Sequence, residues 1–195
     1  MSDQWTVCPW AKGEEYIRYH NEEWGIPCFD DQKLFEKLCL EGQQAGLSWI
    51  TVLNKRDHYR KCFYKFNPNK IAKMSDEDIE TLLLDTGLIR NRLKLYGIRK
   101  NAIAFLALNK QLKKEGRSFS DFIWAFVDHE VQVNRFKALS EVPAQVDEAQ
   151  AMSKALKKAG FTFVGPTICY AFMQSMGLVN DHLTSCPCHP DNDGQ

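Results

Sequence analysis

Apolar residues recur at helical spacing along nearly the whole chain. Residues 75–78 (SDED) form a helix start in which a hydroxyl and a carboxylate can cap free backbone amides, and apolar residues follow at intervals of three and four. Glycine stands behind several such segments, where helices commonly end. The pattern predicts helices over residues 14–22, 91–112, 120–127, 148–159 and 166–176. Because alternating segments joined by tight turns are absent from the sequence, we expect an all-α domain of about seven to ten helices.

One acidic residue lies on the apolar side of a predicted helix. The apolar side of the helix that begins at Asp30 or Asp31 is formed by Leu34, Phe35 and Leu38. The charged residues expected to face away from the core are Lys33, Glu36 and Lys37. At about 100° per residue, Glu41 falls within about 20° of Leu34. If buried, its carboxylate must meet a cation, accept several hydrogen bonds or stay protonated. Alternatively, Glu41 lies in solvent at a frayed helix end or pairs with a lysine.

Aromatic residues stand on both sides of this acid in the sequence. Tyr16 and Tyr19 share one face of a short helix, Trp24 follows at a turn, and Trp49 comes after Glu41. Such rings pack into a core more often than they bind a ligand. Together with a buried carboxylate, however, they describe a pocket for a flat cation such as a cationic purine.

Histidines and cysteines near the two ends of the chain could hold a metal ion. His182 and Cys186 stand at positions i and i+4, so one helical turn can present both to the same ion. Cys8 and His20 could complete a set of four ligands and tie the chain ends together. Such a closed set would be structural, because no coordination position is left to activate water. Buried thiols and ordinary surface histidines are the alternative interpretation.

Composition narrows the class of protein. The 195 residues are 44% hydrophobic and 26% charged, which suits a globular unit rather than a disordered or fibrous chain. Unbroken apolar runs such as residues 122–127 are too short for a membrane span. The start of the chain lacks the order of a secretory signal, so we expect a cytoplasmic protein. Its seven cysteines then suit reduced thiols and metal ligands better than disulfides.

The net charge of zero conceals a basic segment at residues 86–117. This segment has nine lysines and arginines and a single carboxylate, that of Glu115. A solvated helix face explains many such runs. A surface for a polyanion such as DNA is the other interpretation.

Four stretches resemble motifs of the bacterial 3-methyladenine DNA glycosylase I family. They are residues 16–27 (YIRYHNEEWGIP), 40–50 (LEGQQAGLSWI), 161–174 (FTFVGPTICYAFMQ) and 177–182 (GLVNDH). The resemblance implies the helix-hairpin-helix glycosylase fold, double-stranded DNA as partner, and hydrolysis of the N-glycosidic bond of 3-methyladenine, with free 3-methyladenine as product. We expect one monomeric unit with two lobes, residues 30–115 and residues 1–29 with 116–195.

The same resemblance implies roles for individual residues. Glu41 corresponds to the acid that contacts the methylated base, and Leu47 to the residue wedged into the duplex where the base leaves. The aromatic pocket is implied to consist of Tyr16, Tyr19, Trp24 and Trp49. The implied ligands of a structural zinc ion are Cys8, His20, His182 and Cys186. The implied phosphate-binding hairpin consists of Gly87, Leu88, Ile89, Arg90 and Asn91.

Two residues depart from the family pattern. Asn21 stands where an aspartate is usual after the histidine, and Leu93 stands where a small residue often follows the hairpin. In addition, no carboxylate occurs between Asp85 and Glu115, where many relatives on this fold carry the aspartate that activates water. A methylated, cationic base is already weakly bound to its sugar, so we expect Glu41 to act in base recognition and electrostatic positioning. Whether it also activates water as a general base is left open by the sequence. No lysine is clearly placed for a lyase step, which predicts a monofunctional enzyme.

Two other functions fit part of the pattern. A non-catalytic DNA-binding helical domain stabilised by zinc would share the basic segment and the metal ligands but would need no pocket. A zinc hydrolase with Glu41 as its base would need an open site with three protein ligands. Release of 3-methyladenine distinguishes the first from a glycosylase, and the number of metal ligands distinguishes the second.

Overall fold

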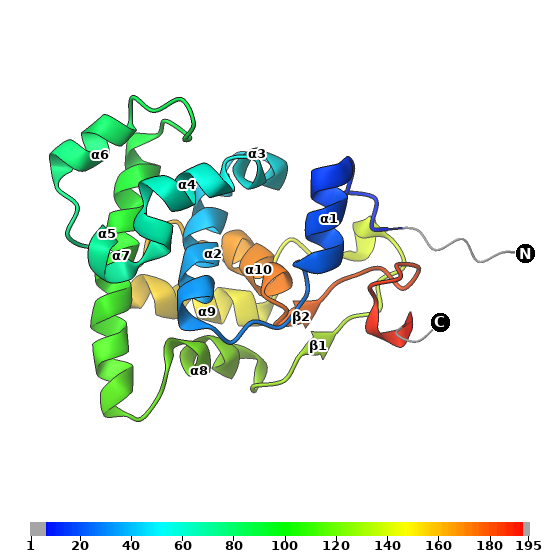
Figure 1. Ribbon diagram of the computed structural model, residues 1–195. Helices are drawn as coiled ribbons and strands as arrows, with labels where there is room; N and C mark the ends of the chain where they lie inside the picture. The colour runs from blue at the N-terminus through cyan, green and yellow to red at the C-terminus, as the bar shows by residue number, and fades with distance from the viewer. Residues whose placement is uncertain (1–6, 193–195) are drawn as a thin grey trace, which may run out of the picture.

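The computed structural model describes residues 7–192, which are mostly helical. Ten α-helices and two very short strands occur in this range (Figure 1). The helices are α1 (Glu14–Glu22), α2 (Asp31–Gln44), α3 (Trp49–Leu53), α4 (Arg56–Cys62), α5 (Pro68–Ile71), α6 (Asp76–Leu82), α7 (Arg92–Lys114), α8 (Phe119–Trp124), α9 (Asp147–Lys158) and α10 (Pro166–Ser175). The strands are β1 (Gln132–Val133) and β2 (Val179–Asn180). The prediction of a helical domain is confirmed, and the predicted helices occur within a few residues of their expected bounds.

Local capping signals set the beginnings of the main helices. The side chain of Asp30 at the start of α2 and that of Asn91 at the start of α7 each accept a hydrogen bond from a first-turn amide. At α6, Ser75 and Asp78 cap each other's backbone amides. Each cap satisfies an amide that has no partner within the helix and stabilises by about 1 kcal/mol.

Helix α2 lies in the middle of the molecule and packs against α7, α8 and α10 (Figure 1). Its side chains Leu34, Phe35, Leu38 and Leu40 are completely buried. Burial of each such side chain contributes about 1.5–3 kcal/mol. Helix α2 is therefore a firmly held support for the polar residues in its last turns.

A parallel pairing of β1 with β2 is not predicted by the sequence. Gln132 pairs with Val179, and Val133 pairs with Asn180. Parallel strands cannot be joined by a tight turn, and here the connection runs through α9 and α10. Strands of two residues leave no alternating pattern that sequence analysis could detect. Their pairing fixes the start of the segment that carries His182.

The two ends of the described chain lie next to each other, on the side of the molecule away from α5, α6 and α7 (Figure 1). Residues 1–6, on which the expectation about a secretory signal rests, lie outside the described residues. Within residues 7–192, no helix combines the length and the apolar character that crossing a membrane requires. The division into two lobes stays a prediction.

Candidate active site and metal centre

Glu41 lies near the C-terminal end of α2 and is buried, with only 2% of its surface exposed. This agrees with the position predicted from helical periodicity. Its Oε1 atom lies 3.4 Å from the ammonium of Lys37, one turn earlier on the same helix. The expectation that Lys37 faces away from the core is wrong, because this residue is 5% exposed. Residues four positions apart share a helix face, and the buried carboxylate supplies the partner that a buried ammonium needs.

A cavity of about 200 Å³ lies beside Glu41. The predicted aromatic residues Tyr16, Tyr19, Trp24 and Trp49 all line it. Among the described residues, two buried side-chain atoms have no hydrogen-bond partner, and both belong to this wall: Oε2 of Glu41 and Nε1 of Trp49. A buried polar group without a partner costs about 1–3 kcal/mol. The cavity therefore suits a ligand that gives a donor to the carboxylate and an acceptor to the indole.

The opposite charges of Glu41 and Lys37 reduce the cost of burying each of these groups. Burial raises the pKa of Glu41, and the ammonium of Lys37 opposes this rise. Burial lowers the pKa of Lys37 to about 8, and the carboxylate of Glu41 opposes that fall. The pKa values of Tyr16 and Tyr19 are raised, first by burial and then by the nearby charge of Glu41. Each member of the ion pair thus depends on the other to stay charged in a dry site.

Several residues of the cavity wall are absent from the predicted site: Trp10, Gln44, Leu139, Val142, Ala171, Gln174 and Asp181. Trp10 packs against Tyr16 and Trp24, with 4.9 Å between ring centroids in each pair. The position of Gln44 in the cavity wall could have been predicted from the sequence, because it stands three positions after Glu41 on a neighbouring part of the same helix face. Trp10 has none, since it lies outside regular structure and reaches the cavity through tertiary contacts.

Asp181 is a second buried carboxylate in the cavity wall. It accepts hydrogen bonds from the hydroxyl of Tyr170, from Nε2 of Gln174 at 2.9 Å and from Nδ2 of Asn134 at 2.7 Å. Its oxygens therefore have partners within the protein, whereas Oε2 of Glu41 has none. Of the two acids, Glu41 offers the free acceptor.

Four residues from the two ends of the chain converge in one buried cluster, as the sequence predicts. The ligand atoms of Cys8, His20, His182 and Cys186 all lie within 4.8 Å of one another. Nε2 of His20 lies 3.1 Å from Nδ1 of His182, and Sγ of Cys186 lies 3.6 Å from each of these nitrogens. Two thiols and two imidazoles in this arrangement could hold a metal ion.

Neighbouring acceptors orient both imidazoles of the cluster. Nδ1 of His20 bonds to Oδ1 of Asn21 at 2.7 Å, and Nε2 of His182 bonds to the backbone oxygen of Trp24 at 3.1 Å. If these ring nitrogens are the protonated donors, the other nitrogen of each ring presents a lone pair to the cluster. Asn21 departs from the family pattern, yet its amide oxygen supplies the acceptor that His20 requires.

The predicted hairpin, residues 87–91, is a tight turn between α6 and α7. Most of its backbone amides donate within the protein, namely those of Gly87, Leu88, Ile89 and Asn91. Gly87 donates to Oδ1 of Asp85 at 2.7 Å, and Ile89 donates to the hydroxyl of Tyr59 at 3.2 Å. The side chain of Arg90 and the first-turn amides of α7 are better placed than these amides to meet a phosphate.

The imidazole of His58 packs directly on this turn. A Cβ atom at position 87 would lie 2.5 Å from the ring of His58, so the close approach requires the glycine. Nε2 of His58 lies 2.7 Å from Oδ2 of Asp85, the residue that also binds the Gly87 amide. The His58–Asp85 pair therefore fixes the start of the turn.

The basic segment presents less free charge than its composition suggests. Lys94 is buried, and its ammonium donates to the backbone oxygens of Gln43 at 2.9 Å and Ala45 at 2.6 Å. Arg92 and Arg99 form ion pairs with carboxylates of α6. Lys94 thus joins the start of α7 to the end of α2, which carries Glu41.

Two leucines near these elements are exposed. Leu47, in the loop between α2 and α3, is 43% exposed, and Leu93, in the first turn of α7, is 73% exposed. The exposure of Leu47 is compatible with the wedge role implied by the resemblance, which stays a prediction.

Comparison with known proteins identifies the family. A family model described as methyladenine glycosylase matches residues 10–189. The chain belongs to the methyladenine glycosylase family. The matched range contains the cavity residues described above and three of the four residues of the metal cluster, with Cys8 lying just before it.

Two curated members of the methyladenine glycosylase family are similar over almost their whole length. The DNA-3-methyladenine glycosylase of Haemophilus influenzae is 60% identical over 185 residues, which are 94% of this chain and 97% of the relative. The DNA-3-methyladenine glycosylase 1 of Escherichia coli is 54% identical over 186 residues, which are 95% of this chain and 97% of the relative.

Solved structures of methyladenine glycosylases share the fold. A crystal structure of a 3-methyladenine DNA glycosylase I matches with a TM-score of 0.90 and 53% identity, covering 95% of this chain and all of that one. A Staphylococcus aureus structure, described as the basis of 3-methyladenine recognition, matches with a TM-score of 0.90 and 35% identity, covering 95% of this chain and 97% of that one.

Proposed function

We propose that this protein is a monofunctional base-excision repair enzyme that hydrolyses the N-glycosidic bond of 3-methyladenine in alkylated double-stranded DNA. The observation that carries this proposal is the free Oε2 atom of a buried carboxylate, Glu41, in a cavity lined by aromatic rings. Relatives that are 60% and 54% identical carry the name DNA-3-methyladenine glycosylase, and one structural neighbour is a variant in complex with 3-methyladenine.

The cavity favours a cationic purine over its neutral parent. Methylation at N3 gives adenine in DNA a positive charge and weakens its bond to the sugar. Glu41 accepts a hydrogen bond from the purine edge, while the rings of Trp49 and the two tyrosines stack against the base. A hydrogen bond between charged partners contributes about 1.5–3 kcal/mol, more than one to a neutral base. Glu41 thus selects the lesion and stabilises the charge near the bond that breaks.

The base must leave the duplex to reach Glu41, because the cavity is buried beside α2. In our proposal, Leu47 occupies the place of the departing base, and the turn at residues 87–91 with the start of α7 forms the helix-hairpin-helix unit that holds phosphates. The exposed side chain of Leu47 and the N-terminal end of the 23-residue helix α7, where the helix dipole is positive, support these roles. Phosphate contacts of this kind position the duplex without reading its sequence.

We further propose that the cluster of Cys8, His20, His182 and Cys186 holds one structural zinc ion. Tetrahedral zinc with bonds of about 2.0–2.3 Å needs ligand atoms about 3.3–3.8 Å apart. In the cluster, the two histidine nitrogens lie 3.1 Å apart, and Sγ of Cys8 lies 3.9 Å from Nδ1 of His182. When bound, zinc cross-links the two chain ends. Four protein ligands leave no position for a reactive water, which disfavours the zinc hydrolase alternative. Action as a monomer in the cytoplasm stays a prediction.

The proposal is tested by release of 3-methyladenine from methylated duplex DNA, measured by chromatography of the freed base. We expect release by the wild-type protein and a loss of roughly 10- to 150-fold in the single-turnover rate of Glu41→Gln, equivalent to about 1.5–3 kcal/mol. Glu36→Gln is the matched control, because Glu36 lies on the same helix outside the cavity and pairs with Arg60.

If the folded wild-type protein releases no methylated base, the role of a non-catalytic DNA-binding domain becomes the better-supported function. Release at an undiminished rate by Glu41→Gln would remove Glu41 from the mechanism while leaving the activity in place.

A further inference from the structure

The ammonium of Lys37 contacts three residues of the cavity at once. It lies 3.4 Å from Oε1 of Glu41, donates a hydrogen bond to the hydroxyl of Tyr19 at 2.5 Å and lies 3.5 Å from the ring centroid of Trp49. The side chain is buried. Its three donors are therefore directed at the carboxylate, the phenol and the indole face that form one side of the cavity.

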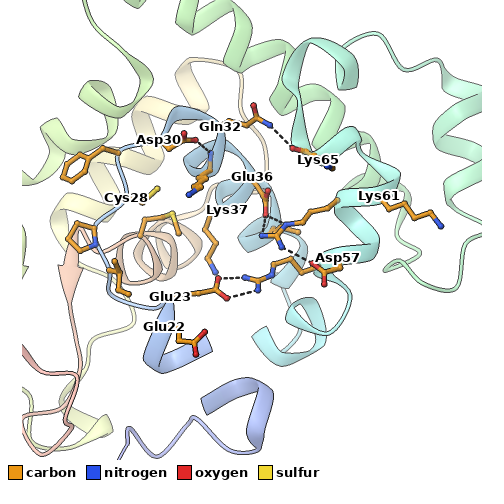
Figure 2. Close-up of a pocket in the computed structure, with 18 residues that line it drawn as sticks. Glu22, Glu23, Cys28, Asp30, Gln32, Glu36, Lys37, Asp57, Lys61 and Lys65 are labelled. Carbon is orange, nitrogen blue, oxygen red and sulfur yellow. Dashed lines mark hydrogen bonds and ion pairs between the residues drawn. The ribbon is translucent and has the colours of Figure 1, made fainter. Parts of the chain in front are cut away.

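Lys37 lines a cleft that is separate from the cavity of Glu41. This larger cleft of about 1100 Å³ is formed in part by residues of α1, α2 and α4, and Lys37 is not among the residues that line the cavity of Glu41. Figure 2 shows this cleft, with Lys37 extending from α2 toward Glu23 at the end of α1. Lys37 therefore acts on the cavity from behind its wall and leaves the space for a base free.

We propose that Lys37 is a positioning residue that keeps the carboxylate of Glu41 ionised and directs its second oxygen toward the base. This inference rests on the proposed function, since it concerns the same cavity. Oε1 of Glu41 faces the ammonium, and Oε2 has no partner among the described residues. The lysine occupies one oxygen of the acid, so that the other stays available to the ligand.

Among the charged groups around the pair, Lys37 supplies the positive charge that balances the carboxylate of Glu41. From α4, Arg56 approaches, but two hydrogen bonds tie its guanidinium to Glu23 at the end of α1. The carboxylate of Glu23 also acts on the ammonium of Lys37. Among the described residues, the remaining titratable groups that act on the pair are the phenols of Tyr16 and Tyr19 from α1, and α10 contributes the hydroxyl of Ser175. Asp181, elsewhere on the cavity wall, is held by its own three donors. None of these groups replaces the charge of Lys37.

Loss of this charge changes what Glu41 can recognise. Burial raises the pKa of Glu41, and the nearby ammonium holds that rise in check. Without the ammonium the carboxyl keeps its proton to higher pH. A protonated carboxyl is neutral, so it no longer prefers a cationic base over ordinary adenine. Lys37 thereby determines the selectivity of the cavity without contacting the base.

The test is the pH dependence of 3-methyladenine release by the wild-type protein and by Lys37→Met. Over the acidic range the charge of the methylated nucleotide is fixed by alkylation, so the protein groups set the acidic limb of the profile. We expect the acidic limb of Lys37→Met to move to higher pH by about one unit, so that its release relative to the wild type falls as the pH is lowered, by up to about tenfold. The two proteins converge above pH 8, because the pKa of Lys37 is about 8 and its ammonium is then lost in the wild type as well.

Lys33→Met is the matched control, because Lys33 lies one turn earlier on α2, lines the same cleft and is exposed. Its profile should superimpose on that of the wild type. Coincident acidic limbs for wild type and Lys37→Met would overturn the proposal, as would an equal shift in Lys33→Met. If Lys37→Met does not fold, Lys37→Gln serves, since it keeps a donor for Tyr19 and removes the charge.

A direct titration separates this proposal from the proposed function. The carboxyl carbon of Glu41, followed by NMR in the wild-type protein without DNA, should change its shift as Lys37 loses its proton near pH 8 and should titrate at higher pH in the lysine variant. Absence of both effects refutes the role of Lys37 even in an active enzyme. Absence of base release with both effects present refutes the glycosylase function alone.

Discussion

Glu41 and Lys37 carry opposite charges into the interior one helical turn apart, and each would be strongly disfavoured there without the other. The pair leaves Oε2 of Glu41 as an acceptor inside an aromatic cavity. Glu36, on the same helix, pairs with Arg60 and lies outside that cavity. Glu36 and Glu41 thus lie on different faces of α2, and of the two only Glu41 reaches the aromatic cavity.

A Leu47 variant can test the proposed opening of the duplex separately from the binding of the base. Because unstacking a base costs a few kcal/mol, we expect Leu47→Ala to lower single-turnover release from duplex DNA by about tenfold or more. Its affinity for free 3-methyladenine, measured by quenching of tryptophan fluorescence, should stay unchanged. Leu84→Ala removes another exposed leucine, which is 79% exposed at the end of α6, and should leave both quantities as they are. Equal losses of release and of free-base affinity in Leu47→Ala would contradict the wedge role.

At the scale of elements, the last turn of α2 is joined directly to the start of α7. The ammonium of Lys94, from the first turn of α7, donates to two backbone oxygens at the end of α2. In return, Nε2 of Gln43 donates a hydrogen bond to the backbone oxygen of Lys94 at 3.1 Å. The hydroxyl of Tyr59 donates to Gln43 at 3.1 Å and accepts from Ile89 in the turn before α7. The cavity and the turn are therefore fixed relative to each other by one buried network.

Removal of the Lys94 ammonium should weaken this junction. In Lys94→Met, two carbonyl groups lose a charged donor and the negative end of the α2 dipole loses a cation. We expect a loss of about 2 kcal/mol in the free energy of unfolding, measured by urea denaturation. Lys100→Met, on an exposed part of α7, should change the same quantity by less than about 0.5 kcal/mol. Equal unfolding midpoints for the two variants would show that the junction contributes little.

At the scale of the whole molecule, the Cys/His cluster joins segments that are far apart in the chain. Cys8 lies before α1, and Cys186 lies beyond β2. The cluster adjoins the cavity, because Trp24 lines that cavity while its backbone oxygen bonds His182. Its integrity therefore supports the aromatic wall as well as the chain ends.

Removal of the proposed zinc ion should destabilise the fold without acting on the chemistry directly. We expect a chelator or Cys186→Ser to lower the free energy of unfolding by about 3 kcal/mol, which is the contribution of a ligand present at roughly 100 times its Kd. Thermal melting with measured zinc content checks this. Cys28→Ser, which changes a cysteine outside both groups of residues that could hold a metal ion, should keep both zinc and melting temperature. A protein that folds with no bound metal and melts unchanged would exclude a structural role.

Prediction from the sequence succeeds best where a single helix decides the geometry. The burial of Glu41 follows from its angular distance to Leu34, and the capped start of α7 at Asn91 follows from local residue chemistry. The side predicted for Lys37 is wrong, because the pattern of charges says nothing about a buried partner one turn away. Trp10 and Asp181 leave no signal, since both reach the cavity from irregular segments.

The sequence by itself determined the helices, their beginnings and the placement of an acid on an apolar face, because these depend on neighbours within a few residues. Only the tertiary structure decided that Trp10 and Asp181 line the cavity, that Lys94 is buried rather than free for DNA, and that Lys37 stands behind the cavity wall. Those outcomes depend on contacts between distant segments and on the burial they create, which no local pattern records.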